Sequence, residues 1–502
     1  MKKKITLILL FLVVQHLFSE TYLDSLLLAY LKNDLTLQKY ALNAKLKALS
    51  YDATKISNGI EVQLSSGTVK IQSSSDGTKY TFTPSASLSI PQASNTSITA
   101  SVPISKKSGY EDDLENGTYI DNGNIKVSTG IISKAPLKRK ISLLEAERAY
   151  LEAERTAKNY ALSVENEFYT KLKTLYSYVQ KVLSSNDDVY DDELSLKILE
   201  LQGYSKTSAS YRKKYLELAS EKRTVEENFR KLERETALFA SKCDVQYEHS
   251  TEPLSFELKA LDSVLAFLPK EIPAVEIEDI SSYKSSSYSK TENAAWSKYI
   301  GELKRSSDYS LELDAYGGYT FNDSSAKYDT VDAGLSFDWK GLSASAGVSV
   351  PTGQNILPVE GSSSGNNSKS LVYTFSFAIK PNTWKLAQVD KNQDELNSKI
   401  DDISIKSAED DYKNAVLDKI TEKSDLLWSE KSYAEEYDMY SKLESDMKNW
   451  LNQGSVTQSD YYDAENNKKK SQLNILINAI DKIIYNNNVK MLFIEDKKQN
   501  GE

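Results

Sequence analysis

The segment ALSVENEFYTKLKTLYSYVQKV, residues 161–182, decides the fold class of this chain. Its apolar side chains step by four and three, the spacing of a coiled-coil seam, at Phe168, Leu172, Leu175, Val179 and Val182. The segment lies in a longer stretch, residues 137–202, that contains neither proline nor glycine. At 1.5 Å rise per residue, we expect this stretch to form one helix about 100 Å long. Solvated rods and pores both contain such helices, so the helices alone do not decide between them.

The same plan occurs twice in the chain. Pro136 precedes the first stretch and Gly203 ends it, while Pro381 precedes a second stretch, residues 384–453, that ends at Gly454. Proline is tolerated at helix starts and glycine is common at helix ends. Seam spacing recurs after Gly203, and more loosely on both sides of Gly454, at Leu396, Ile400, Ile403, Leu473, Leu476, Ile480 and Ile483. Each half is therefore predicted to be a long antiparallel helical hairpin.

Apolar and polar residues alternate in four strand-like segments of each half. These are residues 60–71, 80–90, 96–104 and 125–132 in the first half, and 309–321, 331–339, 342–350 and 371–379 in the second. Alternation over ~10 residues is typical of a transmembrane β-barrel, with lipid on one side and water on the other. A soluble β-sandwich shows the same alternation, so the pattern favours neither strongly.

The N-terminus indicates export. Lys2, Lys3 and Lys4 precede the apolar run 5–14, and Ser19 offers a small residue for cleavage, so residues 1–19 are predicted to be a signal peptide. The apolar run is too short to span a bilayer, and no other apolar stretch approaches twenty residues. A membrane role would therefore depend on strands.

Composition disfavours several classes of function. The net charge is −10, with 72 acidic against 62 basic residues, which argues against nucleic acid and anionic lipid as partners. His249 and Cys243 are the only histidine and cysteine after the signal peptide, too few for a histidine-based metal site or a catalytic triad. There is also no glycine-rich phosphate loop. We expect no enzymatic activity and no cofactor.

Three segments together resemble the TolC family of outer-membrane efflux and secretion channels. They are LLLAYLKNDLTLQKYALNAKLKAL at 26–49, LELDAYGGYTF at 311–321 and GSVTQSDYYDAENN at 454–467. The resemblance implies an internally duplicated α+β membrane protein, in which an antiparallel transmembrane β-barrel is continued by a long antiparallel α-helical coiled-coil barrel. It also implies a homotrimer in the outer membrane that extends into the periplasm. The implied partners are outer-membrane lipid, a periplasmic membrane-fusion adaptor and an inner-membrane pump of the ABC or RND type.

The resemblance also gives the expected organisation. Residues 20–240 would form a first repeat, 241–307 an equatorial belt with a short helix, and 308–495 a second repeat. The first repeat would contain an entry helix at 21–57, strands within 58–134 and a hairpin at 136–240 with its tip at Gly203. The second would contain strands within 308–380 and a hairpin at 384–495 with its tip at Gly454. The family has two strands per half, whereas the sequence shows four segments, so either the extra hairpins are loops or the chain contributes eight strands.

Asp460 and Asp463 are the candidate pore residues, because they match aspartates that ring the constriction in the family. They are three residues apart and would share one face of a helix, and threefold symmetry would make a ring of six carboxylates that attracts cations. Their spacing alone favours a different interpretation, in which acidic residues complement a helix N-terminus.

The tip departs from the family in its closing contacts. Gly203, Gly454, Ser455 and Val456 are the expected adaptor contacts. Val456 stands where some relatives carry an arginine that holds the gate shut, and Ala209 where they carry an aspartate. The basic run Arg212, Lys213 and Lys214 is a candidate to meet Asp460 or Asp463 instead, although a charge run is more often a solvated face. The alternative to a channel is a non-conducting periplasmic scaffold or adaptor, but adaptors generally carry one hairpin per chain.

Overall fold

The computed structural model describes residues 21–91, 95–109, 117–120, 123–250, 259–309, 311–321, 328–354 and 370–494. The predicted signal peptide lies outside the described residues. The chain divides into two compact units. Met1–Asn43, Glu154–Glu292 and Glu409–Glu502 form the first, called here the helical unit. Ala44–Ala153 and Asn293–Ala408 form the second, called here the sheet unit.

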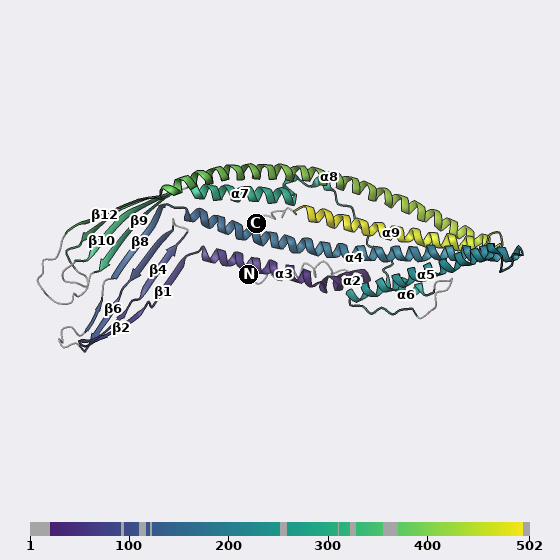
Figure 1. Ribbon diagram of the computed structural model, residues 1–502, viewed down its shortest axis with the longest axis horizontal. Helices are drawn as coiled ribbons and strands as arrows, with labels where there is room; N and C mark the ends of the chain where they lie inside the picture. The colour runs from purple at the N-terminus through teal and green to yellow at the C-terminus, as the bar shows by residue number, and fades with distance from the viewer. Residues whose placement is uncertain are drawn as a thin grey trace. The chain divides into compact units, whose positions relative to one another are not determined.

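Two very long helices dominate the described chain (Figure 1). The α-helices are α2 (Tyr22–Lys32), α3 (Leu35–Ser57), α4 (Ala135–Leu201), α5 (Ala209–Lys242), α6 (Leu261–Phe267), α7 (Ser289–Tyr309), α8 (Pro381–Asn452) and α9 (Gln458–Leu492). Helix α4 is continuous over 67 residues and α8 over 72, and Pro381 is the first residue of α8. The entry helix that the sequence predicted as one piece is two helices, because Asn33 caps the end of α2. Short 3-10 turns at Ile280–Ser282 and Ser285–Ser287 precede α7.

The core of the helical unit is built along α4. Its five predicted seam residues are all buried, with no more than 2% of their surface exposed. They pack in one cluster with Leu232 and Phe239 of α5, Leu26 of α2 and Ile480 of α9. Each such side chain stabilises the fold by about 1.5–3 kcal/mol through burial. The seam predicted from residues 161–182 is therefore the axis on which three other helices assemble.

The seam predicted in the second half is buried only after its glycine. Leu473, Ile480 and Ile483 of α9 are at most 9% exposed, as expected. Leu396 and Ile403 of α8, expected in the same kind of seam, are 59% and 65% exposed. The spacing correctly marks an apolar stripe, but among the described residues nothing covers it at Leu396 and Ile403 of α8.

The sheet unit contains one large antiparallel sheet of eight strands, in the order β1-β4-β5-β8-β9-β10-β11-β12. The strands are β1 (Glu61–Ser65), β4 (Ser85–Ile90), β5 (Thr96–Ser101), β8 (Gly123–Ile132), β9 (Glu312–Phe321), β10 (Thr330–Trp339), β11 (Leu342–Pro351) and β12 (Val372–Ile379). Each half of the chain contributes four of them. The sequence left open whether the extra hairpins are loops or strands of the same sheet. They are strands, because the chain has eight strands in one sheet.

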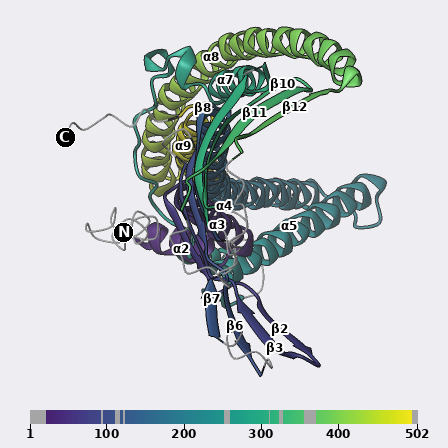
Figure 2. The same ribbon diagram turned by 90° about the vertical axis from the view of Figure 1, so that its left-hand side faces the viewer.

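A second sheet belongs to the first half, with the order β2-β3-β6-β7 (Figure 2). Its strands are β2 (Val69–Ser74), β3 (Gly77–Phe82), β6 (Ile104–Ser108) and β7 (Gly117–Ile120). The sequence predicted single strands where the chain passes from one sheet to the other. Gly67, with φ +66°, separates β1 from β2, and Pro84 and Pro103 separate the next two pairs. Proline interrupts strands because it has no N–H for the ladder.

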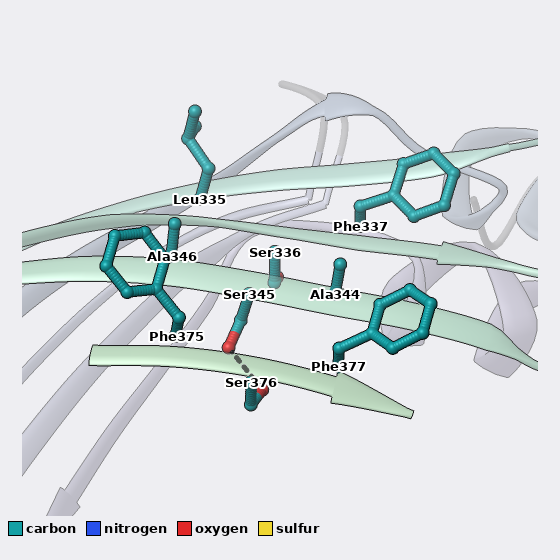
Figure 3. Close-up of a pocket in the computed structure, with 9 residues that line it drawn as sticks. All are labelled: Leu335, Ser336, Phe337, Ala344, Ser345, Ala346, Phe375, Ser376 and Phe377. Carbon is teal, nitrogen blue, oxygen red and sulfur yellow. Dashed lines mark hydrogen bonds between the residues drawn. The ribbon is translucent and has the colours of Figure 1, made fainter. Parts of the chain in front are cut away.

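The two faces of the large sheet differ in chemistry (Figure 3). On one face, Leu335 and Phe337 of β10, Ala344 and Ala346 of β11, and Phe375 and Phe377 of β12 line a shallow apolar hollow. On the other face, Ser336, Ser345 and Ser376 lie side by side in register, and the hydroxyls of the last two are 2.7 Å apart. The strands of the first half follow the same rule, with Ser97 hydrogen-bonded to Ser128 at 2.7 Å. One face is therefore apolar and the other rich in hydroxyl groups.

Among the helices of the described residues, none is both long and apolar enough to cross a membrane.

Candidate functional site

The two hairpin tips close with the same backbone motif. Gly203 and Gly454 adopt left-handed φ values of +78° and +70°. In the first tip, Gly203 N–H donates to Glu200 O and the next residue, Tyr204, donates to Leu199 O; in the second, Gly454 N–H donates to Leu451 O and Ser455 donates to Trp450 O, all at 2.9–3.1 Å. This is the Schellman motif, in which glycine avoids the steric cost of the left-handed region. The duplication seen in the sequence extends to single hydrogen bonds.

Asp460 lies at the start of α9, where it forms a capping box with Thr457. The Thr457 hydroxyl and backbone N–H donate to its carboxylate at 2.7 and 2.9 Å, and Asp460 N–H donates back to the hydroxyl at 3.2 Å. The hydrogen bond from the Thr457 hydroxyl, followed in size of effect by the one from the Thr457 backbone, holds the pKa of Asp460 below its usual value. Asp460 is therefore a charged capping residue in the single chain, which is the helix-terminus role that its spacing favoured.

Asp463 has the opposite environment. Burial raises the pKa of its carboxyl group, and repulsion from Asp187 and Asp191 of α4 raises it further. Asp187 accepts hydrogen bonds from Asn466 at 2.5 Å and from Lys470 at 3.0 Å, and Asp191 accepts one from Ser459 at 3.3 Å. The predicted pair of aspartates is therefore part of a larger acidic group on α4 and α9. The sequence carried a signal for the additional members in the acidic run at 187–193, which was not singled out.

The basic run at the start of α5 is paired locally. Lys214 Nζ lies 2.6 Å from Asp192 and 3.3 Å from Glu217, and Lys213 Nζ lies 3.8 Å from Glu217. Arg212 is exposed on the first turns of α5. Over the residues that the structure describes, no ion pair joins Arg212, Lys213 or Lys214 to Asp460 or Asp463. Lys214 instead ties α5 to α4 within the first hairpin.

A row of polar contacts, called here the polar ladder, joins α4 to α9 and runs along α4 from Asp187 of the acidic group toward the N-terminal end of that helix. Five residues of α4 spaced by seven each exchange side-chain hydrogen bonds with α9: Asn159, Asn166, Lys173, Gln180 and Asp187. Lys173 Nζ contacts both oxygens of Asp481 at 2.7 and 2.8 Å, and Gln180 Nε2 donates to Asn474 Oδ1 at 2.7 Å. A polar residue in a coiled-coil seam specifies register at some cost in stability. The ladder therefore fixes the axial register of α9 against α4.

The described residues contain no cluster of histidine, cysteine, aspartate and glutamate suited to a metal ion. Cys243 is buried at the end of α5, and burial raises the pKa of its thiol to about 12. A thiol with such a pKa is almost fully protonated at neutral pH and is a poor nucleophile.

Two family models match adjoining parts of the chain. The TP096X N-terminal domain matches residues 26–272, and the TP096X C-terminal domain matches residues 273–496. The chain belongs to the TP096X family. The border between the two models falls in the segment that links the two structural halves. No protein with a curated description matches the sequence.

Several solved structures of outer-membrane proteins are similar to this chain. The MtrE channel of Neisseria gonorrhoeae is 12% identical, with 92% of this chain and 88% of that chain covered and a TM-score of 0.43. VceC of Vibrio cholerae is 10% identical, with coverage of 93% and 95% and a TM-score of 0.41. CmeC of Campylobacter jejuni is 12% identical, with coverage of 93% and 84% and a TM-score of 0.41. They belong to the family that the sequence resembles. At these identities and scores, the likeness assigns no function to this chain.

Proposed function

We propose that the protein is an outer-membrane channel, the exit duct of a tripartite efflux pump or type I secretion system. The observation that carries this proposal is the large sheet, which has one apolar face, one hydroxyl-rich face and, among the described strands, no partner at either edge. Phe375 and Phe377 on the apolar face are 79% and 66% exposed. Lipid would cover such a face at no cost, and the hydroxyl-rich face would line water.

Both edges of the sheet need a partner in a membrane, because unpaired backbone groups are costly in lipid. Within the part of the chain that the structure describes, β1 pairs only with β4, and β12 only with β11. With eight antiparallel strands, β1 and β12 run in opposite directions. The β12 edge of one copy can therefore continue into the β1 edge of the next with antiparallel pairing. Copies joined in this way form a closed barrel, and the family resemblance sets their number at three.

The acidic group of α4 and α9 is the proposed constriction. Asp460 and Asp463, repeated by threefold symmetry, place six carboxylates around the axis, and Asp187 and Asp191 add to the negative potential. A narrow ring of like charge attracts cations. The turns at Gly203 and at Gly454, Ser455 and Val456 are the proposed contacts of a periplasmic adaptor, with an ABC or RND pump in the inner membrane beyond it.

Conductance in planar bilayers tests the proposal. Under a KCl gradient, the purified oligomer should give a reversal potential of cation-selective sign, and Asp460→Asn/Asp463→Asn should move that potential toward zero. Asp446→Asn, which removes an exposed charge from α8, is the matched control and should leave it unchanged. An inserted oligomer that never conducts, including after Asp460→Asn/Asp463→Asn, favours the scaffold over the channel. Equal selectivity in all three proteins would keep the channel and remove the two aspartates from its constriction.

A further inference from the structure

The hollow on the apolar face of the large sheet is a groove along β11 (Figure 3). Its floor is the alanine pair Ala344 and Ala346. Larger side chains of the two flanking strands stand on either side of this floor: Leu335 and Phe337 of β10, and Phe375 and Phe377 of β12. The hollow measures about 440 Å³, within the range of roughly 300–1,000 Å³ that is usual for ligand sites. A narrow apolar ligand that lies parallel to the strands fits this shape.

The first half of the chain fills the corresponding position. Strand β5 is the third strand of its half in the large sheet, as β11 is of the second half. On the apolar face, Ile98 of β5 lies between Leu88 of β4 and Val127 of β8. In β11 the residue between two such large neighbours is Ala346. The groove is therefore a local feature of the second half, and general lipid contact of the apolar face does not account for it.

The groove lies at the depth of one leaflet of a bilayer. The β10–β11 turn at Lys340 and Gly341 is at the same end of the sheet as the start of α8 at Pro381. At about 3.3 Å per residue along the strand, Phe337 is ~10 Å from Lys340 and Leu335 is ~17 Å from it. Half of a hydrocarbon core of ~30 Å is about 15 Å. The groove therefore reaches the acyl chains of the leaflet nearest α8, which is the periplasmic leaflet in the proposed orientation.

The end of the groove nearest α8 has the residues of a membrane interface. Trp339 follows Phe337 on the apolar face and is 43% exposed, and tryptophan is enriched at the level of lipid head groups. Lys340 comes next, with a left-handed φ of +46° that residues other than glycine seldom adopt. The backbone N–H of Lys380 donates to Gly341 O at 2.8 Å, so the two lysines belong to adjacent segments. Both lysines are therefore at the level where a lipid phosphate lies.

The charge near these lysines differs from that of the whole chain. The net charge of −10 argued against an anionic membrane surface as a partner. A single phosphate group depends on the local charge instead. Asp338, the acidic residue nearest to Lys340 in sequence, belongs by strand alternation to the hydroxyl-rich face, opposite the groove. The apolar side of this end therefore combines an exposed tryptophan with two lysines.

We infer that the groove and the two lysines form a binding site for one phospholipid molecule of the periplasmic leaflet. One acyl chain lies along Ala344 and Ala346, and Lys340 and Lys380 bind the phosphate. The inference rests on the membrane span in the proposed function, and it adds a defined site to the general lipid contact of the sheet. A chain in the groove gains dispersion contacts from a floor and two walls, whereas a chain on a flat part of the face gains them from one side.

Lipid binding by the purified oligomer tests the groove. The delipidated protein is loaded with dioleoylphosphatidylglycerol or with dioleoylglycerol, which has the same chains and no phosphate. Native mass spectrometry then measures how many molecules each oligomer retains. Ala344→Leu/Ala346→Leu fills the groove and should lower the retention of both lipids severalfold. Ala100→Leu makes the same kind of change on the apolar face of β5 and should retain both lipids as the wild type does.

The phosphate end is tested in the same assay. Lys340→Gln/Lys380→Gln should weaken the binding of dioleoylphosphatidylglycerol by about 30-fold, the usual effect of two lysines near an anionic lipid. It should leave the binding of dioleoylglycerol unchanged, because that lipid has no phosphate. Lys448→Gln removes an exposed lysine of α8 in the helical unit and is the matched control, which should bind both lipids as the wild type does.

Equal retention of both lipids by the wild type and the two test variants would overturn the inference, because lipid would then be held by the apolar face in general. An equal loss of both lipids in the lysine variant would remove the phosphate from Lys340 and Lys380. If the filled variant does not assemble, the lysine variant decides alone. The same proteins are reconstituted in planar bilayers to separate this result from the proposed function. Variants that conduct and retain lipid like the wild type refute the site while the channel stands. Wild-type protein that neither inserts nor retains lipid refutes both.

Discussion

Tyr316 and two glycines provide a sharp test of the large sheet. Tyr316 of β9 faces Gly334 of β10, which in turn faces Gly347 of β11, all on the hydroxyl-rich side. A Cβ atom added to Gly334 would lie 2.6 Å from two ring carbons and from the hydroxyl oxygen of Tyr316, and one added to Gly347 would lie 2.7 Å from that hydroxyl oxygen. Lys126 Nζ lies 4.6 Å from the ring centroid. The tyrosine therefore lies across two strands in space that only glycine leaves free.

We expect Gly334→Ala to destabilise the protein by about 1–3 kcal/mol, the usual cost of overpacking. Ordinary contact requires 3.4–4 Å, so the ring must move by roughly 1 Å or more. In the background of Tyr316→Ala the same change should cost nothing or stabilise, because alanine in a strand has less conformational entropy to lose than glycine. The control is Gly317→Ala, whose Cβ would meet only a backbone oxygen at 4.0 Å.

The assay is urea unfolding of the detergent-solubilised protein, followed by tyrosine and tryptophan fluorescence, for wild type, both alanine variants and the double variant. If Gly334→Ala is as stable as Gly317→Ala, the ring does not occupy the position described. If Gly334→Ala destabilises equally with and without Tyr316, the strain arises from the backbone and the reasoning is refuted.

Three further predictions concern the helical unit. Burial raises the pKa of Asp463 in the folded protein, so the protonated carboxyl group is the form that the fold favours. Its contribution to stability is complete below the unfolded pKa and is lost as pH rises through the folded value, so Asp463→Asn should be more stable than wild type at pH 7 and equal to it below about pH 4. Thermal melts at both pH values check this, and an Asn variant that is less stable at pH 7 contradicts it. A double-mutant cycle on Lys173 and Asp481 should give a coupling of about 0.2–1 kcal/mol that falls in 1 M salt, because the pair is partly exposed; zero coupling at low salt would remove this pair from the ladder. Thr457→Ala should lower the free energy of unfolding by about 1 kcal/mol, because the helix cap is lost. It should also raise the pH at which Asp460 loses its charge, which the pH dependence of the reversal potential measures. Thr457→Ser keeps the hydroxyl and should behave as wild type.

Local structure was readable from the sequence wherever a single physical rule governed it. Gly203 and Gly454 mark helix ends because few other residues tolerate their φ values, and the spacing of Phe168 and Leu172 marks a seam because helices repeat every 3.6 residues. The break between α2 and α3 at Asn33 was missed, since asparagine is a weaker signal than proline or glycine.

What covers a stripe could not be read from its spacing. Leu172 and Leu396 have the same pattern, yet one is buried and the other exposed, because periodicity reports that a helix has an apolar face and not whether the partner belongs to the same chain. The acidic group shows the same limit. Asp463 was found through its distance from Gly454, whereas its neighbour Asp187 is 276 residues away in sequence and only the fold brings the two together.

The ladder between α4 and α9 limits how the two hairpins can slide along each other. Lys173 meets a carboxylate, Asp481, whereas α9 presents asparagines, Asn474 and Asn488, at the two neighbouring levels. A shift of α9 by one level would therefore set Lys173 opposite an asparagine and leave Asp481 without its cation. A shift of that size would change the axial offset of the two helices by about 10.5 Å. Intermediate offsets break every level at once. The axial offset between the two hairpins is therefore fixed in discrete steps, and any force along their axis must tilt or bend the helices before it can slide α9 along α4.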